Sequence, residues 1–436
     1  MKTPILPLIA TGLLALTPWM GALGEEWNQY RGPRLDGISK EPILRAWPAN
    51  GLKQSWKVPL TDGFSSFSTG SGKAYTLVNR LVEGVKRETV VALDLATGKE
   101  VWAYPIAVSK FDGGGDSGTQ DNGGGDGPRS TPAFSEGKVY VYSAGLKLVC
   151  VNADSGTLAW TRDIVQQHAG RSIRWQNAAS PAIDGSLIFV AGGGTGQALL
   201  AIDRQTGEPV WKGEDDLMTH ATPVVATLLG QRQVIYFTQS GLVSLDVKSG
   251  KALWRHKFPY NVSTAASPVV SGDIVYCSAG YNVGSSAARI AKKGEDWSAT
   301  ELWRLTGNKI CNHWSTPVAL NGHLYGMFSF KEYGKGPLKC VEMATGIEKW
   351  AQPGFGPGNV TLVDGQLLVL TDAGELVLVK PDPSGYRESA RMKAVQGKCW
   401  STPVVSQGRA LVRSTREGAS LLIAPATAST TTSLRP

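Results

Sequence analysis

The sequence is poor in cysteine, in charged residues and, beyond its N-terminus, in long apolar runs. Its 436 residues include five cysteines, which are too few and too widely spaced for a disulfide scaffold, and their odd number leaves at least one thiol unpaired. No CxxC or CxxCH motif occurs, which argues against a structural zinc cluster and covalent haem. No later run approaches the ~20 apolar residues of a membrane span, so we expect none in the mature protein.

The first 24 residues have the three-part pattern of an export signal. Lys2 comes first, an apolar run from Ile5 to Leu16 follows, and Ala22-Leu23-Gly24 provides a cleavage site of small residues. No cysteine follows this site, so a lipoprotein anchor is not indicated. We therefore expect residues 1–24 to be a signal peptide and the mature protein to be periplasmic or secreted.

The formal net charge of +8 favours an anionic partner such as an acidic polysaccharide. The Lys and Arg residues are scattered along the chain and form no basic stripe, and an exported protein is not expected to bind nucleic acid. With 42% hydrophobic residues the chain can bury a large core, so we expect a globular protein.

Two patterns alternate along the chain. The first is Ser/Thr-Pro before a short apolar strand, a turn and a second strand, as in STPAFSEGKVYVYS from Ser130. The second is an apolar strand, a Thr/Ser-Gly turn and a Trp four residues after the Gly, as in ALDLATGKEVW ending at Trp102. The first pattern recurs at Pro132, Pro181, Pro223, Pro268, Pro317 and Pro403, with degenerate copies from Phe67 and Asn359. The second ends at Trp102, Trp160, Trp211, Trp254, Trp303 and Trp350, and Ser389 replaces the Trp in the seventh copy.

These repeats predict an all-β, eight-bladed β-propeller of four-stranded antiparallel blades. Most copies of the first pattern are 42 to 49 residues apart, which suits one blade. The turn Gly provides a positive φ, and the Trp is large enough to fill the wedge between blades. Each Pro opens a first strand along the central channel, where a missing N–H costs least.

The ends of the chain indicate how the ring closes. After Ser401 there are three strand-like runs, ending near Ile423, without a fourth strand or a Trp. Leu52 to Leu60 contains Trp56 and precedes the first complete repeat, so we expect this segment to complete the last blade.

The A-x-D-x-x-T-G-x-x-x-W repeat, together with the Ser/Thr-Pro starts, resembles the pyrroloquinoline-quinone (PQQ) repeat family. This family includes quinoprotein alcohol dehydrogenases and the propeller of outer-membrane barrel assembly. WNQYRGPRLDGIS (residues 27–39) also resembles the opening of exported bacterial members of uncertain role. We expect an N-terminal extension at 25–51, the propeller at 52–424 with an insert loop at 112–127, and a disordered tail at 425–436.

The resemblance places ligands at the mouth of the central channel, beside the residues that lead into each first strand. These polar and aromatic residues would suit a sugar, a quinone or a peptide carboxylate, and the alternative is that they satisfy backbone groups in tight loops. The candidates are Arg129, Gln176 with Asn177, Thr219 with His220, Asn261, Asn312 with His313 and Trp314, Asn359, and Lys398 with Trp400.

Histidines and cysteines offer weaker candidates for chemistry. His220 and His313 are the leading acid/base or metal groups, although a loop histidine is more often structural. Cys150 and Cys340 occupy one repeat position and are interpreted as packing residues. Cys311 and Cys399 both precede first strands and are the pair whose placement permits a disulfide at the channel mouth.

The insert at 112–127 is rich in Gly and Asp. Asp112, Asp116, Asp121 and Asp126 could bind Ca²⁺, but their spacing matches no established calcium loop. A solvated loop is the favoured interpretation, and its position beside Arg129 would let it cover the channel mouth.

Three functions remain open, because one fold hosts many activities. The first is a monomeric binding or scaffold propeller with a small-molecule, glycan or protein partner. The second is a dehydrogenase of alcohols or sugars that uses PQQ with Ca²⁺. This sequence lacks the adjacent Cys-Cys pair and the acidic lead-in residues that such an enzyme would need. The third is a carbohydrate-active lyase or hydrolase using His220, His313 and Arg129, for which no paired carboxylates are evident.

Overall fold

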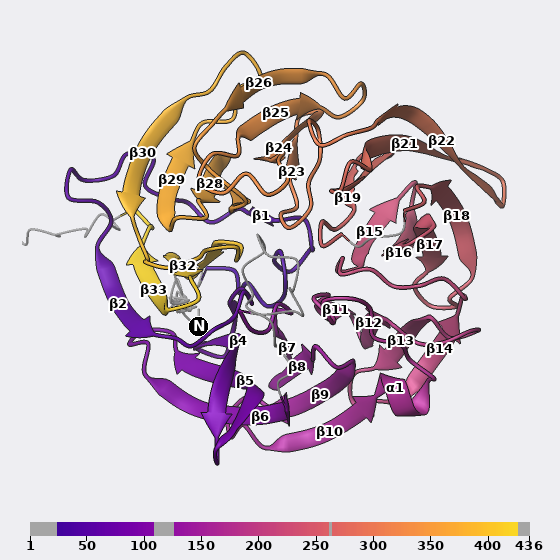
Figure 1. Ribbon diagram of the computed structural model, residues 1–436, viewed down its shortest axis with the longest axis horizontal. Coiled ribbons are helices and arrows are strands. Elements are labelled where there is room, and N and C mark those ends of the chain that lie inside the picture. Colours follow the sequence, from indigo (N-terminus) through magenta and orange to yellow (C-terminus); the bar gives the residue numbers. More distant parts are fainter. Residues whose placement is uncertain (1–23, 109–125, 261–263, 426–436) are drawn as a thin grey trace, which may run out of the picture.

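The computed structural model describes residues 24–108, 126–260 and 264–425, and their strands form eight sheets in a ring (Figure 1). This confirms the prediction of an all-β, eight-bladed propeller. The expected signal peptide up to residue 23, the insert from residue 112 to residue 125, the candidate Asn261 and the tail from residue 426 lie outside the described residues.

The first four blades each contain four antiparallel strands in sequence order. Blade 1 contains β3 (Ser68–Gly70), β4 (Lys73–Val82), β5 (Val85–Asp94) and β6 (Glu100–Val108). Blade 2 contains β7 (Ala133–Ser135), β8 (Lys138–Tyr142), β9 (Lys147–Asn152) and β10 (Leu158–Asp163), which is followed by α1 (Ile164–Gln167). Blade 3 contains β11 (Ala182–Asp184), β12 (Leu187–Ala191), β13 (Leu199–Asp203) and β14 (Pro209–Gly213). Blade 4 contains β15 (Val224–Leu228), β16 (Gln231–Thr238), β17 (Gly241–Asp246) and β18 (Ala252–Lys257).

The last four blades follow the same plan, with two additions from the N-terminal segment. Blade 5 contains β19 (Val269–Ser271), β20 (Ile274–Ala279), β21 (Gly284–Lys293) and β22 (Asp296–Leu305). Blade 6 contains β23 (Val318–Leu320), β24 (His323–Met327), β25 (Leu338–Glu342) and β26 (Glu348–Gln352). Blade 7 contains β27 (Asn359–Val363), β28 (Gln366–Leu370), β29 (Glu375–Val379) and β30 (Glu388–Lys393), joined by β1 (Ile38–Ser39). Blade 8 contains β31 (Val404–Ser406), β32 (Arg409–Arg413), β33 (Glu417–Leu422) and the N-terminal β2 (Gln54–Pro59).

Within the described ranges, no helix is long and apolar enough to span a membrane.

The ring closes as predicted, through β2. This strand pairs with β33 and places Trp56 opposite Ser420, so the N-terminal segment supplies the outermost strand of blade 8. The buried Arg413 on β32 adds a second connection to blade 1, because its guanidinium donates to Thr76 Oγ1 and to the Leu77 and Gly63 carbonyls. Burial lowers the pKa of Arg413 to about 9, so the group still carries most of its charge at neutral pH.

The recurring Trp binds the turn of the next blade rather than merely filling a wedge. Trp102 of blade 1 donates its indole N–H to the Ala153 carbonyl of blade 2, and its ring lies on Gly156. A Cβ at Gly156 would come within 2.7 Å of that ring. The same contact joins Trp56 to Gly98, Trp160 to Gly207, Trp211 to Gly250, and Trp303 to Gly346. The turn Gly is therefore needed for its positive φ and for the space that the neighbouring Trp occupies.

Trp254 departs from this pattern. Its indole N–H donates to Gln233 Oε1 of its own blade. The next blade has the long β21–β22 hairpin in place of the short Gly turn, so the usual acceptor is missing at this blade boundary.

A second set of contacts joins the blades around the channel and explains the Ser/Thr of the Ser/Thr-Pro pattern. The backbone N–H of Thr131 in blade 2 donates to Ser180 Oγ in blade 3 at 2.8 Å, and Ser180 N–H donates to Thr222 Oγ1 in blade 4 at 2.9 Å. The same bond runs from Thr402 to Ser66, from Ser66 to Thr131, and from Ser267 to Thr316. We call these five bonds the inner hydrogen-bond ring.

The N-terminal segment crosses the centre of the ring, as Figure 1 shows in indigo, which the sequence did not predict. Gln29 accepts a hydrogen bond from the Ile183 N–H of blade 3, and Arg31 donates to the Thr316 and Pro317 carbonyls of blade 6. β1 then pairs in parallel with the innermost strand of blade 7. The WNQYRGPRLDGIS motif therefore joins inner strands from opposite sides of the propeller.

Two glycines of blade 2 test the role of the Trp contact. Gly156 (φ +70°) carries the ring of Trp102, whereas Gly137 (φ +73°) has no atom within 4 Å of an added Cβ. We expect Gly137→Ala to lower the free energy of unfolding by about 1–2 kcal/mol, the cost of a left-handed backbone for alanine. Gly156→Ala should lower the free energy of unfolding by about 1–3 kcal/mol more than Gly137→Ala does, because the added methyl group displaces the Trp102 indole. Denaturant unfolding measures both, and equal losses would contradict the Trp contact.

Candidate functional site

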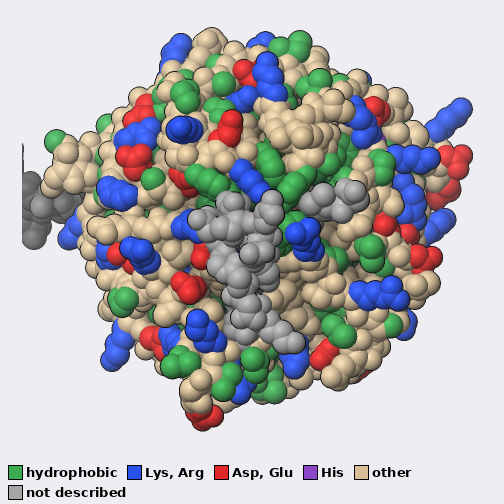
Figure 2. Space-filling model, in the orientation of Figure 1, with side chains coloured by type: hydrophobic (Ala, Val, Ile, Leu, Met, Phe, Trp, Pro, Cys, Tyr) green, Lys and Arg blue, Asp and Glu red, His purple; other side chains and the backbone are tan. Residues whose placement is uncertain are grey.

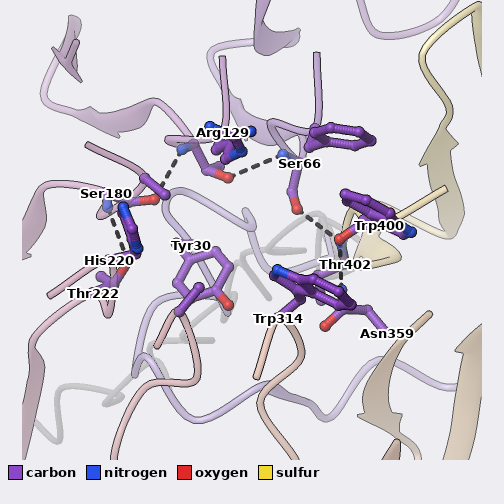
Figure 3. Close-up of a pocket in the computed structure, with 14 residues that line it drawn as sticks. Tyr30, Ser66, Arg129, Ser180, His220, Thr222, Trp314, Asn359, Trp400 and Thr402 are labelled. Atoms are coloured by element: carbon purple, nitrogen blue, oxygen red, sulfur yellow. Dashed lines mark hydrogen bonds between the residues drawn. The ribbon is translucent and has the colours of Figure 1, made fainter. Parts of the chain in front are cut away.

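A pocket lies at the channel mouth, where the lead-ins to the first strands converge (Figure 3). Its empty volume is about 540 Å³, part of which is open to solvent. The inner hydrogen-bond ring forms much of its wall, because Ser66, Thr131, Ser180, Thr222 and Thr402 all line it. The remaining lining residues are Tyr30, Phe64, Arg129, Ala178, His220, Ala265, Trp314, Asn359 and Trp400.

The structure brings five predicted site residues together in this pocket. Figure 3 shows Arg129 and His220 at one side of the cavity and Trp314, Asn359 and Trp400 at the other. Burial lowers the pKa of Arg129 to about 10, so the guanidinium remains cationic at neutral pH. Asn359 occupies the Ser/Thr position of blade 7, and its Nδ2 donates to the Trp400 carbonyl. Its buried Oδ1 has no hydrogen-bond partner among the described residues.

Two other predicted residues are fixed to the backbone, as the alternative interpretation held for loop residues. Asn177 Nδ2 donates to the Ser143 and Ala179 carbonyls, and its Oδ1 accepts the Ala179 N–H. Asn312 accepts a bond from the Tyr276 hydroxyl and donates to the Met327 carbonyl. Both side chains are almost fully buried and lie outside the pocket lining.

The two histidines are buried and neutral. Burial, with Arg129 nearby, lowers the pKa of His220 to about 3, and burial likewise lowers the pKa of His313 to about 3. His220 lines the pocket, whereas His313 lies among the rings of Tyr281, Trp314 and Phe330. A neutral imidazole can accept or donate a hydrogen bond, but these pKa values lie far from those of a general base at neutral pH.

Aromatic rings and one ion pair surround the pocket opening. Trp400 stacks on Phe64 with ring centroids 4.4 Å apart and on Trp314 at 5.1 Å. Lys398 lies over Trp400 and pairs with Asp126, the one candidate calcium ligand among the described residues. Asp112, Asp116 and Asp121 lie outside the described residues. Elsewhere in the described chain, no group of three or more His, Cys, Asp or Glu side chains could hold a metal ion.

All five cysteines are buried and free. Cys150 and Cys340 are fully buried packing residues, as their repeat position predicted. Cys311 and Cys399, the pair considered for a disulfide at the channel mouth, are not bonded. Burial raises the pKa of each of these two thiols to about 12, so neither is a ready nucleophile at neutral pH.

Three residues at this site were not among the candidates predicted from the sequence. Tyr30 projects into the pocket from the crossing N-terminal segment, and Phe64 lies in the degenerate lead-in of blade 1. Trp175 stands one position before the predicted Gln176, and its carbonyl accepts a hydrogen bond from Arg129. An aligned reading of each lead-in over four positions would have found Trp175, but no repeat signal marks Tyr30.

The protein-family profile described as "Outer membrane protein assembly factor BamB" matches residues 86–325, which is more than half of the chain. The chain belongs to this PQQ-repeat family. The BamB protein of Yersinia pestis is 20% identical over 312 residues, which cover 68% of this chain and 69% of that protein.

Two alcohol dehydrogenase (quinone) dehydrogenase subunits also match this BamB-like chain. Those of Komagataeibacter europaeus and Gluconobacter oxydans are each 24% identical, over 44% and 55% of this chain. The matches cover only 25% and 33% of those longer relatives.

Solved structures show the same fold. BamB from Moraxella catarrhalis superimposes with a TM-score of 0.57 and 14% identity, over 85% of this chain and 97% of that one. The quinohemoprotein alcohol dehydrogenase from Comamonas testosteroni superimposes with a TM-score of 0.63 and 12% identity, over 92% of this chain and 81% of that one.

The pocket histidine of this BamB-like propeller should make its stability depend on pH. In the unfolded chain His220 titrates near pH 6.5, whereas in the folded protein its pKa is about 3. Between these values the unfolded state binds more protons, so the free energy of unfolding falls as the pH falls from 6.5 towards 3. We expect His220→Gln to reduce this slope by up to about 1.4 kcal/mol per pH unit.

Denaturant unfolding from pH 7.5 to pH 4 measures the slope. His323→Gln is the matched control, because His323 is the first residue of β24, is not among the pocket-lining residues, and its ring nitrogen contacts the Asn321 carbonyl. If His220→Gln retained the full wild-type slope, the buried neutral state of His220 would be refuted.

Proposed function

We propose that this protein is an exported, monomeric binding propeller whose ligand enters the pocket at the channel mouth. The observation that carries the proposal is the composition of the pocket wall. It combines a desolvated cation, Arg129, with two Trp rings and with Asn359 Oδ1, an acceptor to which no described residue donates a hydrogen bond. A concave site with a few convergent polar groups is a typical binding site.

The position of Tyr30 supports a pocket rather than an open channel. The segment that carries it crosses the ring and is held by Gln29 on blade 3 and by Arg31 on blade 6. A ligand entering at the mouth would therefore meet Tyr30 and would not pass through the propeller. This arrangement favours retention of a ligand over passage through the channel.

The pocket does not fit PQQ with Ca²⁺, the cofactor of the dehydrogenase hypothesis. A flat quinone held between two rings needs about 7 Å between them, that is two contact distances of about 3.5 Å. The Phe64–Trp400 and Trp314–Trp400 pairs are already in contact at 4.4 and 5.1 Å. In addition, no Asp or Glu is among the described residues that line the pocket, so this part of the wall supplies no carboxylate, either as a calcium ligand or as a base.

The lining also gives little support to the lyase or hydrolase hypothesis. Glycoside hydrolysis typically uses two carboxylates that face each other across the substrate, and the lining residues that the structure describes include none. The pKa of about 3 at His220 leaves this residue neutral at the pH at which it would have to act as an acid.

Binding can be tested through the tryptophans of the pocket. The full chain, purified after export, is titrated with glucuronate, glucose, a short peptide carboxylate, and PQQ with Ca²⁺, while Trp fluorescence and thermal stability are recorded. We expect saturable binding of at least one ligand in this panel. Arg129→Met should weaken that binding roughly 30-fold, which corresponds to about 2 kcal/mol, because a buried charge contact is lost.

Arg289→Met is the matched control, since Arg289 is an exposed residue of the β21–β22 hairpin paired with Asp273. It should bind as the wild type does. The proposal fails if neither this panel nor the oligosaccharide panel described below contains a ligand that binds, if Arg129→Met leaves affinity unchanged, or if PQQ with Ca²⁺ supports dye reduction with alcohols or aldoses.

A further inference from the structure

Six aromatic side chains follow one another in ring contact around the channel mouth, and we call them the aromatic arc. Successive ring centroids are 6.1, 4.5, 6.0, 5.1 and 4.4 Å apart. In order, the arc comprises Trp175, Tyr281, Phe330, Trp314, Trp400 and Phe64. They come from lead-ins and loops of blades 3, 5, 6, 8 and 1, so the arc extends well beyond the pocket.

The arc has a buried end and a solvent-facing end. Trp400 and Phe64 are 9% and 6% exposed and line the pocket, whereas Trp175, Tyr281 and Phe330 are only half-buried. A ligand that filled the pocket could therefore continue outward along aromatic surface. The arc suits an elongated ligand better than a compact one.

Cations lie on the faces of these rings. The Arg174 guanidinium is 4.6 Å from the centre of the Trp175 ring, Lys331 Nζ is 5.3 Å from Tyr281 and from Phe330, and Lys398 Nζ is 5.2 Å from Trp400. Figure 2 shows Lys or Arg and hydrophobic side chains next to one another around the centre of this face. Positive charge therefore lies against the rings at three points along the arc.

Among the residues that the structure describes, positive charge exceeds negative charge along the arc. Arg129 at the pocket end adds to Arg174, Lys331 and Lys398. Asp126 offsets Lys398 through their ion pair, and Glu332 is the chain neighbour of Lys331. The excess complements an anionic ligand and agrees with the +8 charge of the whole chain.

The backbone under the arc is strained. Trp175 and Tyr281 adopt left-handed conformations, with φ of +65° and +58°, and Lys331 has a φ of +57°. Bulky residues rarely adopt this conformation, and such strain gathers at sites that hold ligands in place. Here the strained backbone presents the two rings that stack on each other at 6.1 Å.

We propose that the ligand is an anionic oligosaccharide, a chain of pyranose rings bearing carboxylate or sulfate groups, that lies along the aromatic arc with one end in the pocket. The inference rests on the proposed function and names the ligand class for that site. A pyranose presents an apolar C–H face that can pack against the exposed parts of the half-buried rings, and the cations beside these rings meet its acidic groups. Repetition of ring and cation along the arc matches a ligand whose units repeat.

Binding of defined oligosaccharides to the full chain tests the proposal. Isothermal titration calorimetry compares an oligogalacturonate, its methyl-esterified form, a sulfated dextran oligomer, neutral dextran and an oligoglutamate peptide. We expect one or both anionic glycans to bind, with an affinity that falls as salt rises because charge contributes. The carboxylate and sulfate arms distinguish the two sources of negative charge.

Arc variants with matched controls locate the binding. Lys331→Met and Trp175→Leu should each weaken glycan binding roughly threefold to tenfold, the range expected for one cation–π or stacking contact. Lys292→Met and Trp297→Leu remove a similar pair, with Lys292 Nζ 5.0 Å from the Trp297 ring, on the outer β21–β22 hairpin. These two controls should bind as the wild type does.

The outcomes separate this inference from the proposed function. The inference is overturned if the neutral or esterified glycan binds as well as the anionic one, if only the peptide binds, or if the arc variants bind like their controls. If a ligand still depends on Arg129 in any of these cases, the binding function stands without the glycan. Absence of binding by every ligand in both panels would overturn both.

Discussion

The propeller depends on hydrogen bonds that join neighbouring blades around the channel, five of which run from a backbone N–H to the Ser or Thr hydroxyl of the next blade. Thr131, Ser180 and Thr222 show the arrangement, since each residue belongs to the inner hydrogen-bond ring and stands directly before a Pro. Pro opens the strand and lacks an N–H, so the preceding residue provides the donor. These bonds hold the lead-ins at fixed spacing, and the pocket wall is built from the same residues.

The outer contacts act with the inner ones. The Trp102 ring packs on Gly156 of the next blade, and five blades make this contact. The ring fits there because glycine has no side chain. Inner bonds and outer rings fix both ends of the interface between blades, while β2 and Arg413 close the remaining gap between blades 8 and 1. Within this frame the lead-in loops can carry strained residues such as Trp175, because the strain is supported by rigid blades on either side.

Much of the fold was predictable because it repeats. The recurring Pro and Trp positions predicted the number and order of the blades. The strand with Trp56 predicted how the ring closes, because an unpaired sheet edge needs a partner strand. The path of residues 27–39 was not predictable, because Gln29 and Arg31 bind backbone groups of residues that lie 154 and 285 positions away. Contacts of that kind leave no periodic signal in a single sequence.

The sequence by itself determined that an eight-bladed ring would form and that polar and aromatic lead-ins would meet at its channel mouth. Only the tertiary structure decided which of these residues face the cavity. The side-chain amides of Asn177 and Asn312 hydrogen-bond to backbone groups away from the cavity, whereas Asn359 lines the pocket. The difference depends on which buried backbone groups near each amide need a hydrogen-bond partner. The aromatic arc also depends on the tertiary structure. Trp175, Tyr281 and Phe330 are far apart in the chain and come into contact only in the folded propeller.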